Sequence, residues 1–384
     1  MGRTPIMRAK DVKLEGMASL ADEFSKGGWQ PARKVLSKVE AVPTIFPQFD
    51  YMNRVGGLPL ARIMTLHGPS SHGKTKAALG MLLSFLKAKH FAALIDAEST
   101  TPHSWCSELM AEYADSACFM ASRPDSYEDA NDGVRNFCTT IAEAREKGRI
   151  PPNTSGLVVV DSLRKLVPKD FFAKLMKKGA DEVGFDGMGG RGAQIKAGIN
   201  AQWLDEIVSL LNATNCALVL IVREYEDANA SALDKKFGND YKIAGGGAPI
   251  YDSSLVVRVT RASWIARGGE SKEVLGERHL LRIWKTKVAG KSERTVDCYF
   301  HTSNGVMIPE GYDLARDLIE LAIKFEMMKQ EGAWIRWGDR SFNGVNQAVE
   351  KITADPAVLA ELDTQVRSGF GQDLDEESAE VSGL

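Results

Sequence analysis

The sequence has few cysteines, no long apolar run and almost no excess of charge. Cys106, Cys118, Cys138, Cys216 and Cys298 are scattered without CxxC spacing, which predicts buried thiols in a reducing cytoplasm. The N-terminus lacks a secretory pattern, and the longest apolar runs are too short to cross a bilayer. The net charge of −3 gives no overall basic signature, so contact with nucleic acid would depend on local patches. We therefore expect a cytoplasmic protein without a membrane segment.

The alternation of short apolar runs with helical patterns predicts the fold of the central region. The runs and the helical patterns between them lie at 63–67, 77–89, 91–95, 127–147, 157–161, 197–211 and 216–222. Such alternation predicts an α/β fold, with a mostly parallel central sheet flanked by helices. After Ser254, three segments alternate with period two, which predicts antiparallel strands that extend this sheet.

The two ends of the chain differ from the central core. Residues 1–42 are basic and polar with helical stretches from Met17, and they predict an N-terminal helical arm outside the core at 43–309. Residues 310–370 are mainly helical with a small hairpin near Gly332–Trp337, which predicts a small α+β C-terminal domain. Residues 371–384 predict a solvated acidic tail.

A glycine-rich octet lies between an apolar run ending at His67 and a helical stretch that begins near Lys76. Its residues are Gly68, Pro69, Ser70, Ser71, His72, Gly73, Lys74 and Thr75. This is the pattern of a P-loop, in which backbone N–H groups and a helix N-terminus surround a phosphate chain. Lys74 would reach the β- and γ-phosphates of ATP, and Thr75 the Mg²⁺ ion. The alternative is a glycine-rich turn that binds nothing.

Two carboxylates follow apolar strands near this loop. Asp161 ends the run Leu157–Asp161, where P-loop proteins place a magnesium ligand, although such an aspartate can also cap the following helix. Glu98 follows the run that ends at Asp96, where a group that orients and deprotonates water is needed. Its alternative is a surface glutamate at a strand end. We interpret Asp161 as a metal ligand and Glu98 as the general base.

Together these motifs resemble the recombinase family of bacterial RecA and its phage relatives such as UvsX. The resemblance rests on Gly56–Ile63, the octet, Leu94–Glu98, Val158–Ser162, Ala244–Tyr251, Trp284–Lys287, Gly332–Trp334 and Asp355-Pro356. It covers nearly the whole chain from about residue 42. It implies a RecA-type P-loop core, a polymerisation arm at 1–42 and a small C-terminal domain.

The resemblance also assigns roles within the ATP site. Glu98 would activate the attacking water, and Trp105 would stack on the adenine. Lys285 and Lys287 would reach the γ-phosphate of a neighbouring subunit's ATP, whereas alternation alone favours an exposed strand face. Arg223 stands where RecA has a glutamine that senses the γ-phosphate, and a permanent cation there could contact phosphate directly.

Two glycine-rich stretches, at about 168–193 and 224–247, correspond in the resemblance to the loops that bind DNA. The candidate DNA-binding residues in and near them are Arg191, Lys196, Lys235, Lys236, Lys242, Gly245, Gly246 and Gly247. These cations would hold single-stranded DNA mainly through its phosphates. The alternative is a charged loop that is only solvated.

The function implied by the resemblance is a DNA-dependent ATPase that uses Mg-ATP and catalyses homologous recombination. Its subunits would form a helical filament on single-stranded DNA and pair that strand with a homologous duplex. The long first loop and Arg223 favour a phage form over a bacterial one. Two alternatives share the phosphate site: a nucleotide-gated filament on single-stranded DNA with little turnover, and a ring helicase with a RecA core.

Overall fold

A computed structural model describes residues 26, 28–30, 39–169, 190–227, 229–233, 241–243, 246–266, 274–288, 294–301 and 311–371. The chain divides into a unit at Met1–Val39 and a larger unit at Glu40–Leu384. The predicted arm helix, most of the first loop and residues 372–384 of the acidic tail lie outside the described residues. Glu40 to Val42, expected in the arm, belong to the larger unit.

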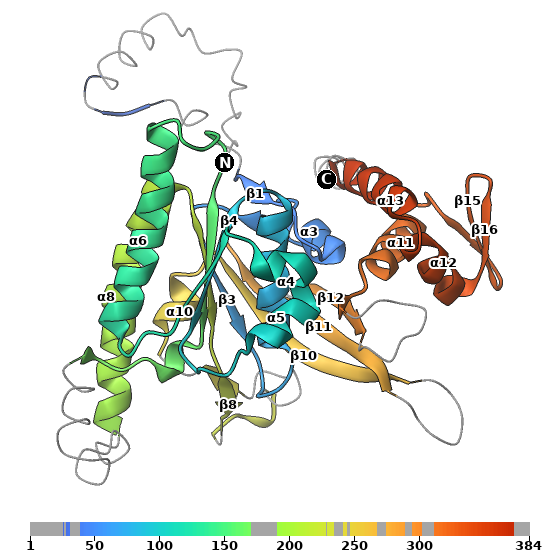
Figure 1. The fold of residues 1–384 in the computed structure, drawn as a ribbon. Helices are drawn as coiled ribbons and strands as arrows, with labels where there is room; N and C mark the ends of the chain where they lie inside the picture. Colours follow the sequence, from blue (N-terminus) through green and yellow to red (C-terminus); the bar gives the residue numbers. More distant parts are fainter. Residues whose placement is uncertain are drawn as a thin grey trace, which may run out of the picture. The chain divides into compact units, whose positions relative to one another are not determined.

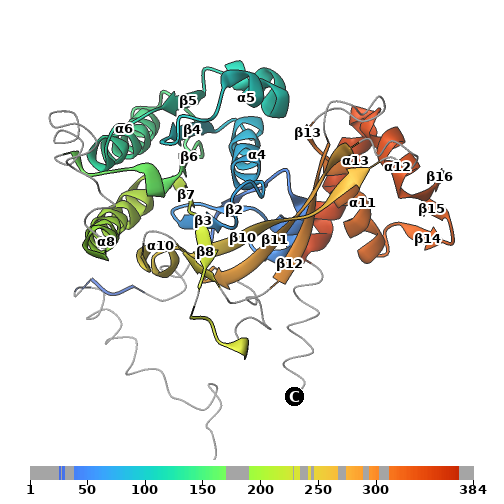
Figure 2. The ribbon, with the colours of Figure 1, turned by 90° about the horizontal axis from the view of Figure 1, so that it is seen from below.

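Among the described residues, the larger unit is built on a nine-stranded sheet with the order β13-β12-β11-β10-β3-β7-β6-β4-β5 (Figures 1 and 2). Its strands are β3 (Ile63–His67), β4 (Phe91–Asp96), β5 (Phe119–Ser122), β6 (Gly156–Asp161), β7 (Ala217–Ile221), β10 (Leu255–Ala266), β11 (Val274–Thr286), β12 (Arg294–His301) and β13 (Gly311–Tyr312). The strands from β10 through β5 pair in parallel, and β10 to β13 pair antiparallel. The predicted parallel sheet with an antiparallel extension is therefore confirmed.

Helices cover both faces of the parallel part of the sheet (Figure 2). The helices of this region are α3 (Pro47–Met52), α4 (Lys74–Lys87), α5 (His103–Met110), α6 (Tyr127–Glu146), α8 (Gly190–Thr214) and α10 (Ala248–Tyr251), with 3-10 turns η3 (Ala111–Asp115) and η4 (Leu163–Lys165). Alternate residues of one strand face opposite sides. In β6, Leu157 and Val159 pack in one core with α4 and α5, whereas Val158 and Val160 pack in another with α6 and α8.

Several elements differ from the sequence-based expectation. The edge strand β5 was not predicted, because its apolar run, Phe119 to Ala121, is too short to distinguish from a loop. Two short strands, β1 (Ala41–Val42) and β2 (Leu58–Pro59), form a separate pair. The helix α8 begins at Gly190, inside the segment that we expected to be a loop. The second predicted loop is bounded by paired strands, β8 (Glu224–Glu226) and β9 (Tyr241–Ile243).

The C-terminal segment forms its own small core, as predicted. Its elements are α11 (Leu314–Lys324), β14 (Lys329–Glu331), β15 (Trp334–Trp337), β16 (Arg340–Asn343), α12 (Gly344–Thr353), α13 (Pro356–Ser368) and the 3-10 turn η6 (Gly369–Gly371). The expected hairpin has a third strand, since β15 pairs with both β14 and β16.

Among the described residues, no helix combines the length and apolar character that a membrane span requires.

An ion pair with a fully buried carboxylate joins the C-terminal segment to the core. Arg367 of α13 donates to Asp50 of α3 at 2.7 Å and to the carbonyl oxygen of Thr44 at 2.7 Å. Asp50 is fully buried and also accepts hydrogen bonds from the backbone and hydroxyl of Thr44. Removing one partner of a buried pair leaves the other charge uncompensated, which is far more costly than losing an exposed pair.

We expect Arg367→Ala to lower the free energy of unfolding by about 3 kcal/mol, because Asp50 would remain buried without its cation. Urea titrations followed by tryptophan fluorescence would measure the change. Arg340→Ala is the matched control, since Arg340 pairs with Glu361 where both side chains are exposed. It should cost less than about 1 kcal/mol. Equal losses in the two variants would contradict the anchoring role of Arg367.

Candidate functional site

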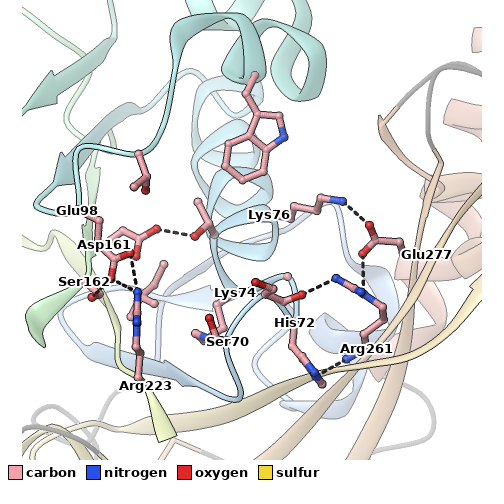
Figure 3. A pocket seen from close by; sticks show the side chains of 16 residues that line it. Ser70, His72, Lys74, Lys76, Glu98, Asp161, Ser162, Arg223, Arg261 and Glu277 are labelled. Carbon is pink, nitrogen blue, oxygen red and sulfur yellow. Dashed lines mark hydrogen bonds and ion pairs between the residues drawn. The ribbon is translucent and has the colours of Figure 1, made fainter.

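The main polar pocket lies at the carboxyl ends of the parallel strands, where ligands bind in open α/β folds. It has a volume of about 380 Å³ and is lined by residues that follow β3, β4, β6 and β7. Figure 3 shows two groups of labelled side chains around it, with Glu98, Asp161, Ser162 and Arg223 on one side, and Glu277 and Arg261 on the other. Six of the eight octet residues, Ser70 to Thr75, line this pocket.

The octet connects the fully buried strand β3 to α4, as the P-loop pattern predicts. Gly73 has φ +88°, a left-handed conformation that favours glycine. A Cβ at this position would lie 2.4 Å from the ring of His279, so a larger residue would have to displace that ring. The loop therefore holds a shape that brings its backbone close to a ligand at the N-terminus of α4.

Lys74 is buried at the centre of the loop. Its ammonium group donates to the carbonyl oxygens of Gly68 at 2.9 Å and Pro69 at 2.6 Å. Burial lowers the pKa of Lys74 from its ordinary value, with nearby Asp161 acting in the opposite direction. A phosphate group at this place would supply the anion that such a buried cation requires.

Thr75 and Asp161 meet at the start of α4. The Thr75 hydroxyl donates to the Asp161 carboxylate at 2.6 Å, and Asp161 is 5% exposed. Burial raises the pKa of Asp161 to about 6, although the hydrogen bond from Thr75 lowers it. A buried carboxylate next to a hydroxyl fits Mg²⁺, which takes few protein ligands and completes its shell with water and substrate phosphates.

Glu98 is held at the other side of Asp161. Its backbone N–H donates to the Asp161 carbonyl at 3.1 Å, while its carboxylate accepts from Ser162 at 2.6 Å and from Arg223 at 2.9 Å on both oxygens. Burial raises the pKa of Glu98, but the hydrogen bond from Ser162 and the charge and hydrogen bond of Arg223 outweigh it. The net pKa therefore lies below its usual range. The sequence pointed to Glu98 and Arg223, but not to their contact or to Ser162.

Asp96 fixes the loop that carries Glu98. It is buried at the end of β4 and accepts from the backbone N–H groups of Thr100 at 3.3 Å and Thr101 at 3.2 Å. Arg123 donates to it at 3.3 Å. This role was not predicted from the sequence, although an acidic residue at the end of a buried strand was a usable signal. Trp105, in α5, lines the same pocket. It is partly buried and packs against the core that contains α4 and α5.

Lys285 and Lys287 lie away from this pocket. Lys285 donates to the carbonyl oxygens of Ile250 and Tyr251, and Lys287 also donates to that of Tyr251. Neither lysine is among the residues that line the pocket. The single chain therefore does not bring these two expected site residues to its own P-loop.

The predicted DNA-binding residues are only partly described. Lys235, Lys236 and Gly245 lie outside the described residues, and Arg191 and Lys196 belong to α8 but their side chains are not described. Lys242 is exposed on β9, 3.0 Å from Asp227. Gly246 has φ +86°, and Gly247 precedes α10.

A buried cluster behind Arg223 was not expected from the sequence. Glu224 accepts from Arg258 at 2.6 Å and lies 3.1 Å from the Nδ1 atom of His67, the residue before the P-loop. The Arg258 guanidinium stacks on Tyr241 of β9 at 4.2 Å. Arg223 and Glu224 are consecutive: Arg223 contacts Glu98 in the pocket, and Glu224 belongs to this cluster. The stem of the second loop, which begins at Glu224, thus directly follows the pocket residue Arg223.

Comparison with known proteins agrees with this geometry. The family profile described as the RecA N-terminal domain matches residues 14–306. The chain is 27% identical over 356 residues to the Protein RecA of Clostridium tetani, covering 92% of this chain and 90% of that protein. It is 28% identical over 357 residues to the Protein RecA of Aquifex aeolicus, covering 92% and 91%. It is 27% identical over 370 residues to that of Clostridioides difficile, covering 96% and 94%.

Proposed function

The chain belongs to the RecA family of DNA-dependent ATPases, which act in recombination and repair, and from this premise we propose that it is a strand-exchange protein. It would polymerise on single-stranded DNA with Mg-ATP and exchange that strand with a homologous duplex. One observation carries the proposal: the P-loop, Asp161 and Glu98 converge on one pocket. The family supplies the link between this pocket and DNA.

In this proposal the phosphate chain of ATP lies over the N–H groups of the octet, and Lys74 turns from the Gly68 and Pro69 carbonyls to the β- and γ-phosphates. Thr75 and Asp161 would hold Mg²⁺, which neutralises charge on the phosphates when bound. Trp105 would cover the base. Glu98 would accept a proton from the water that attacks the γ-phosphorus, while the bond to the bridging oxygen breaks.

Arg223 gives this reaction a switch. As long as its guanidinium holds both oxygens of Glu98, the carboxylate is a poor proton acceptor. A γ-phosphate is the natural competitor for that cation, since arginine binds phosphate and carboxylate with the same bidentate geometry. The turn of Arg223 toward ATP would then release Glu98 and stabilise charge on the transferred group.

DNA would be bound by the two loops and sensed through the second of them. The stem of that loop, β8 and β9, is tied to the P-loop by Glu224, His67, Arg258 and Tyr241. Movement of the stem would reach Arg223 through Glu224. Affinity for single-stranded DNA should fall with salt, with a slope of about −0.7 per phosphate neutralised.

Polymerisation is supported by the open edge of the sheet. Among the described residues, β5 pairs only with β4, and a groove of about 420 Å³ with an apolar lining that includes Met120 and Phe137 adjoins it. An unpaired strand next to an apolar surface is a place where a second copy could add a strand. The role of the arm at 1–42 in this contact stays a prediction.

The test is ATP hydrolysis by the purified chain with and without single-stranded DNA. Strong stimulation by DNA would support a recombinase-type ATPase. A nucleotide-gated filament with little turnover is the second candidate, and the Arg223–Glu98 ion pair is the observation that favours it. Tight ATP-dependent DNA binding without hydrolysis would decide for this second function.

Lys285→Ala should lower DNA-stimulated hydrolysis about 100-fold, because a cation that stabilises the transferred phosphoryl group would be lost while Lys287 remains. ATP binding to the isolated chain should not change, since Lys285 does not line the pocket of its own chain.

A mixing experiment separates action across a subunit interface from action within one chain. Lys285→Ala subunits keep an intact P-loop, and Lys74→Ala subunits keep Lys285 and Lys287. Mixed filaments should therefore recover the hydrolysis that neither variant has alone. Absence of recovery, in mixtures that electron microscopy shows to be co-assembled, would argue that Lys285 acts within its own subunit.

A further inference from the structure

The pocket has a second charged wall, which was not predicted from the sequence. Glu277 of β11 lies at its centre and is 7% exposed. Its carboxylate accepts from Lys76 of α4 at 2.9 Å and from Arg261 of β10 at 3.2 Å. Figure 3 shows Lys76, Glu277 and Arg261 across the pocket from Glu98 and Arg223. All three line the cavity.

This wall is joined to the P-loop itself. Arg261 donates through its backbone N–H to Nδ1 of His72 at 3.1 Å and through its guanidinium to the carbonyl of Ser71. His279 lies between the two parts, with Nδ1 3.1 Å from the His72 carbonyl oxygen and Nε2 2.9 Å from Glu277. Glu277 therefore orients two cations and connects both to the loop that receives the phosphates.

The basic groups that contact Glu277 indicate that it is an anion in this arrangement. The contact with His279 and that with Lys76 lower its pKa to about 2, although burial opposes them. A carboxylate held by three basic groups cannot easily serve as a proton acceptor. Its chemistry suits the positioning of cations instead.

We propose that Glu277 is a positioning residue of the nucleotide site, which presents Lys76 and Arg261 to the part of the nucleotide that ATP and ADP share. Consecutive residues of α4 face opposite walls of the pocket. Thr75 faces Asp161, on the side where the γ-phosphate and its attacking water belong. Lys76, one residue later, points to the opposite wall. Arg261 and Lys76 would then contact the α-phosphate and ribose end.

The two walls would have separate tasks. The wall of Glu98 and Arg223 would distinguish ATP from ADP, because it faces the γ-phosphate. The wall of Glu277 would hold both nucleotides equally, and uniform binding changes KM without changing kcat. The inference rests on the proposed ATPase function but addresses nucleotide affinity, which can be measured without DNA.

The experiment measures the Kd of fluorescent ATP and ADP analogues, together with KM, kcat and thermal stability, for Glu277→Gln. We expect both Kd values and KM to rise about tenfold by the same factor, with kcat at saturating ATP within about twofold of the parent. Lys76→Met should give the same pattern, and it keeps the test valid where loss of Glu277 impairs folding. Glu331→Gln, which changes an exposed carboxylate paired with Arg336, is the matched control.

Three outcomes would overturn the inference: unchanged Kd values in both variants, a loss confined to ATP, or a fall in kcat at unchanged Kd. A lowered thermal stability with unchanged Kd values would likewise overturn it, because Glu277 would then only support the loop. If the parent chain itself bound no ATP, the proposed function would fail first. A parent that binds and hydrolyses ATP normally, with variants that do the same, would remove only the inference about Glu277.

Discussion

Lys74→Ala is expected to lower kcat/KM for ATP hydrolysis by more than about 1000-fold, since one preorganised donor to a developing charge contributes about 100- to 1000-fold and Lys74 would also bind the ground state. Lys74 is 7% exposed, and its ammonium group contacts the Gly68 carbonyl at the start of the octet. Loss of ATP-dependent DNA binding should accompany the loss of hydrolysis. Steady-state kinetics and ATP binding at several concentrations would measure both effects.

The matched control is Lys87→Ala, at the last turn of the same helix, where the side chain is exposed. It removes a lysine from α4 without touching the octet, so its kinetics should equal those of the parent. Hydrolysis by Lys74→Ala at the parent rate would refute the assignment of this pocket as the ATP site.

Glu98→Gln should lower kcat about 1000-fold while ATP binding is retained, because a general base contributes about 100- to 10,000-fold and the amide cannot accept the proton. The glutamine is nearly the same size and can still accept from Ser162 and Arg223, so the pocket should keep its shape. ATP would then persist in the filament. We expect complexes of this variant with single-stranded DNA to form normally and to dissociate much more slowly.

The control is Glu108→Gln, an exposed glutamate on α5, which should behave as the parent. Two results would be informative against the proposal. Parent-like hydrolysis by Glu98→Gln would place the base elsewhere, and slow hydrolysis with rapid dissociation from DNA would break the link between turnover and release.

The parallel core could be predicted from the sequence, because each of its buried strands shows a local run of apolar residues. A buried strand such as Val158–Val160 needs apolar residues on both faces, so its pattern is visible without knowledge of its neighbours. The edge strand β5 has no such requirement, and its four residues form too short a run to detect. The β8–β9 pair was missed for another reason: three-residue strands at the ends of a polar segment carry too little signal.

The candidate site divides in the same way. Lys74, Thr75, Asp161 and Glu98 follow strands, and residues at the carboxyl ends of parallel strands meet at one edge of the sheet. The Glu277 wall depends on a contact between residues 201 positions apart, Lys76 and Glu277, from a helix and an antiparallel strand. Period-two alternation places Glu277 on one face of β11 but cannot say which helix lies opposite. Only the folded arrangement supplies that information.

The separation of Lys285 and Lys287 from their own nucleotide pocket has a consequence for the ends of an assembly. If each subunit completes the site of its neighbour, a helical row of n subunits holds n nucleotides but only n − 1 complete sites. The ATP of one terminal subunit then has no lysines from a neighbour. At the opposite end, Lys285 and Lys287 of the terminal subunit have no neighbouring ATP to contact. Such a row has a direction, its two tips differ in chemistry, and short rows should hydrolyse less ATP per subunit than long ones.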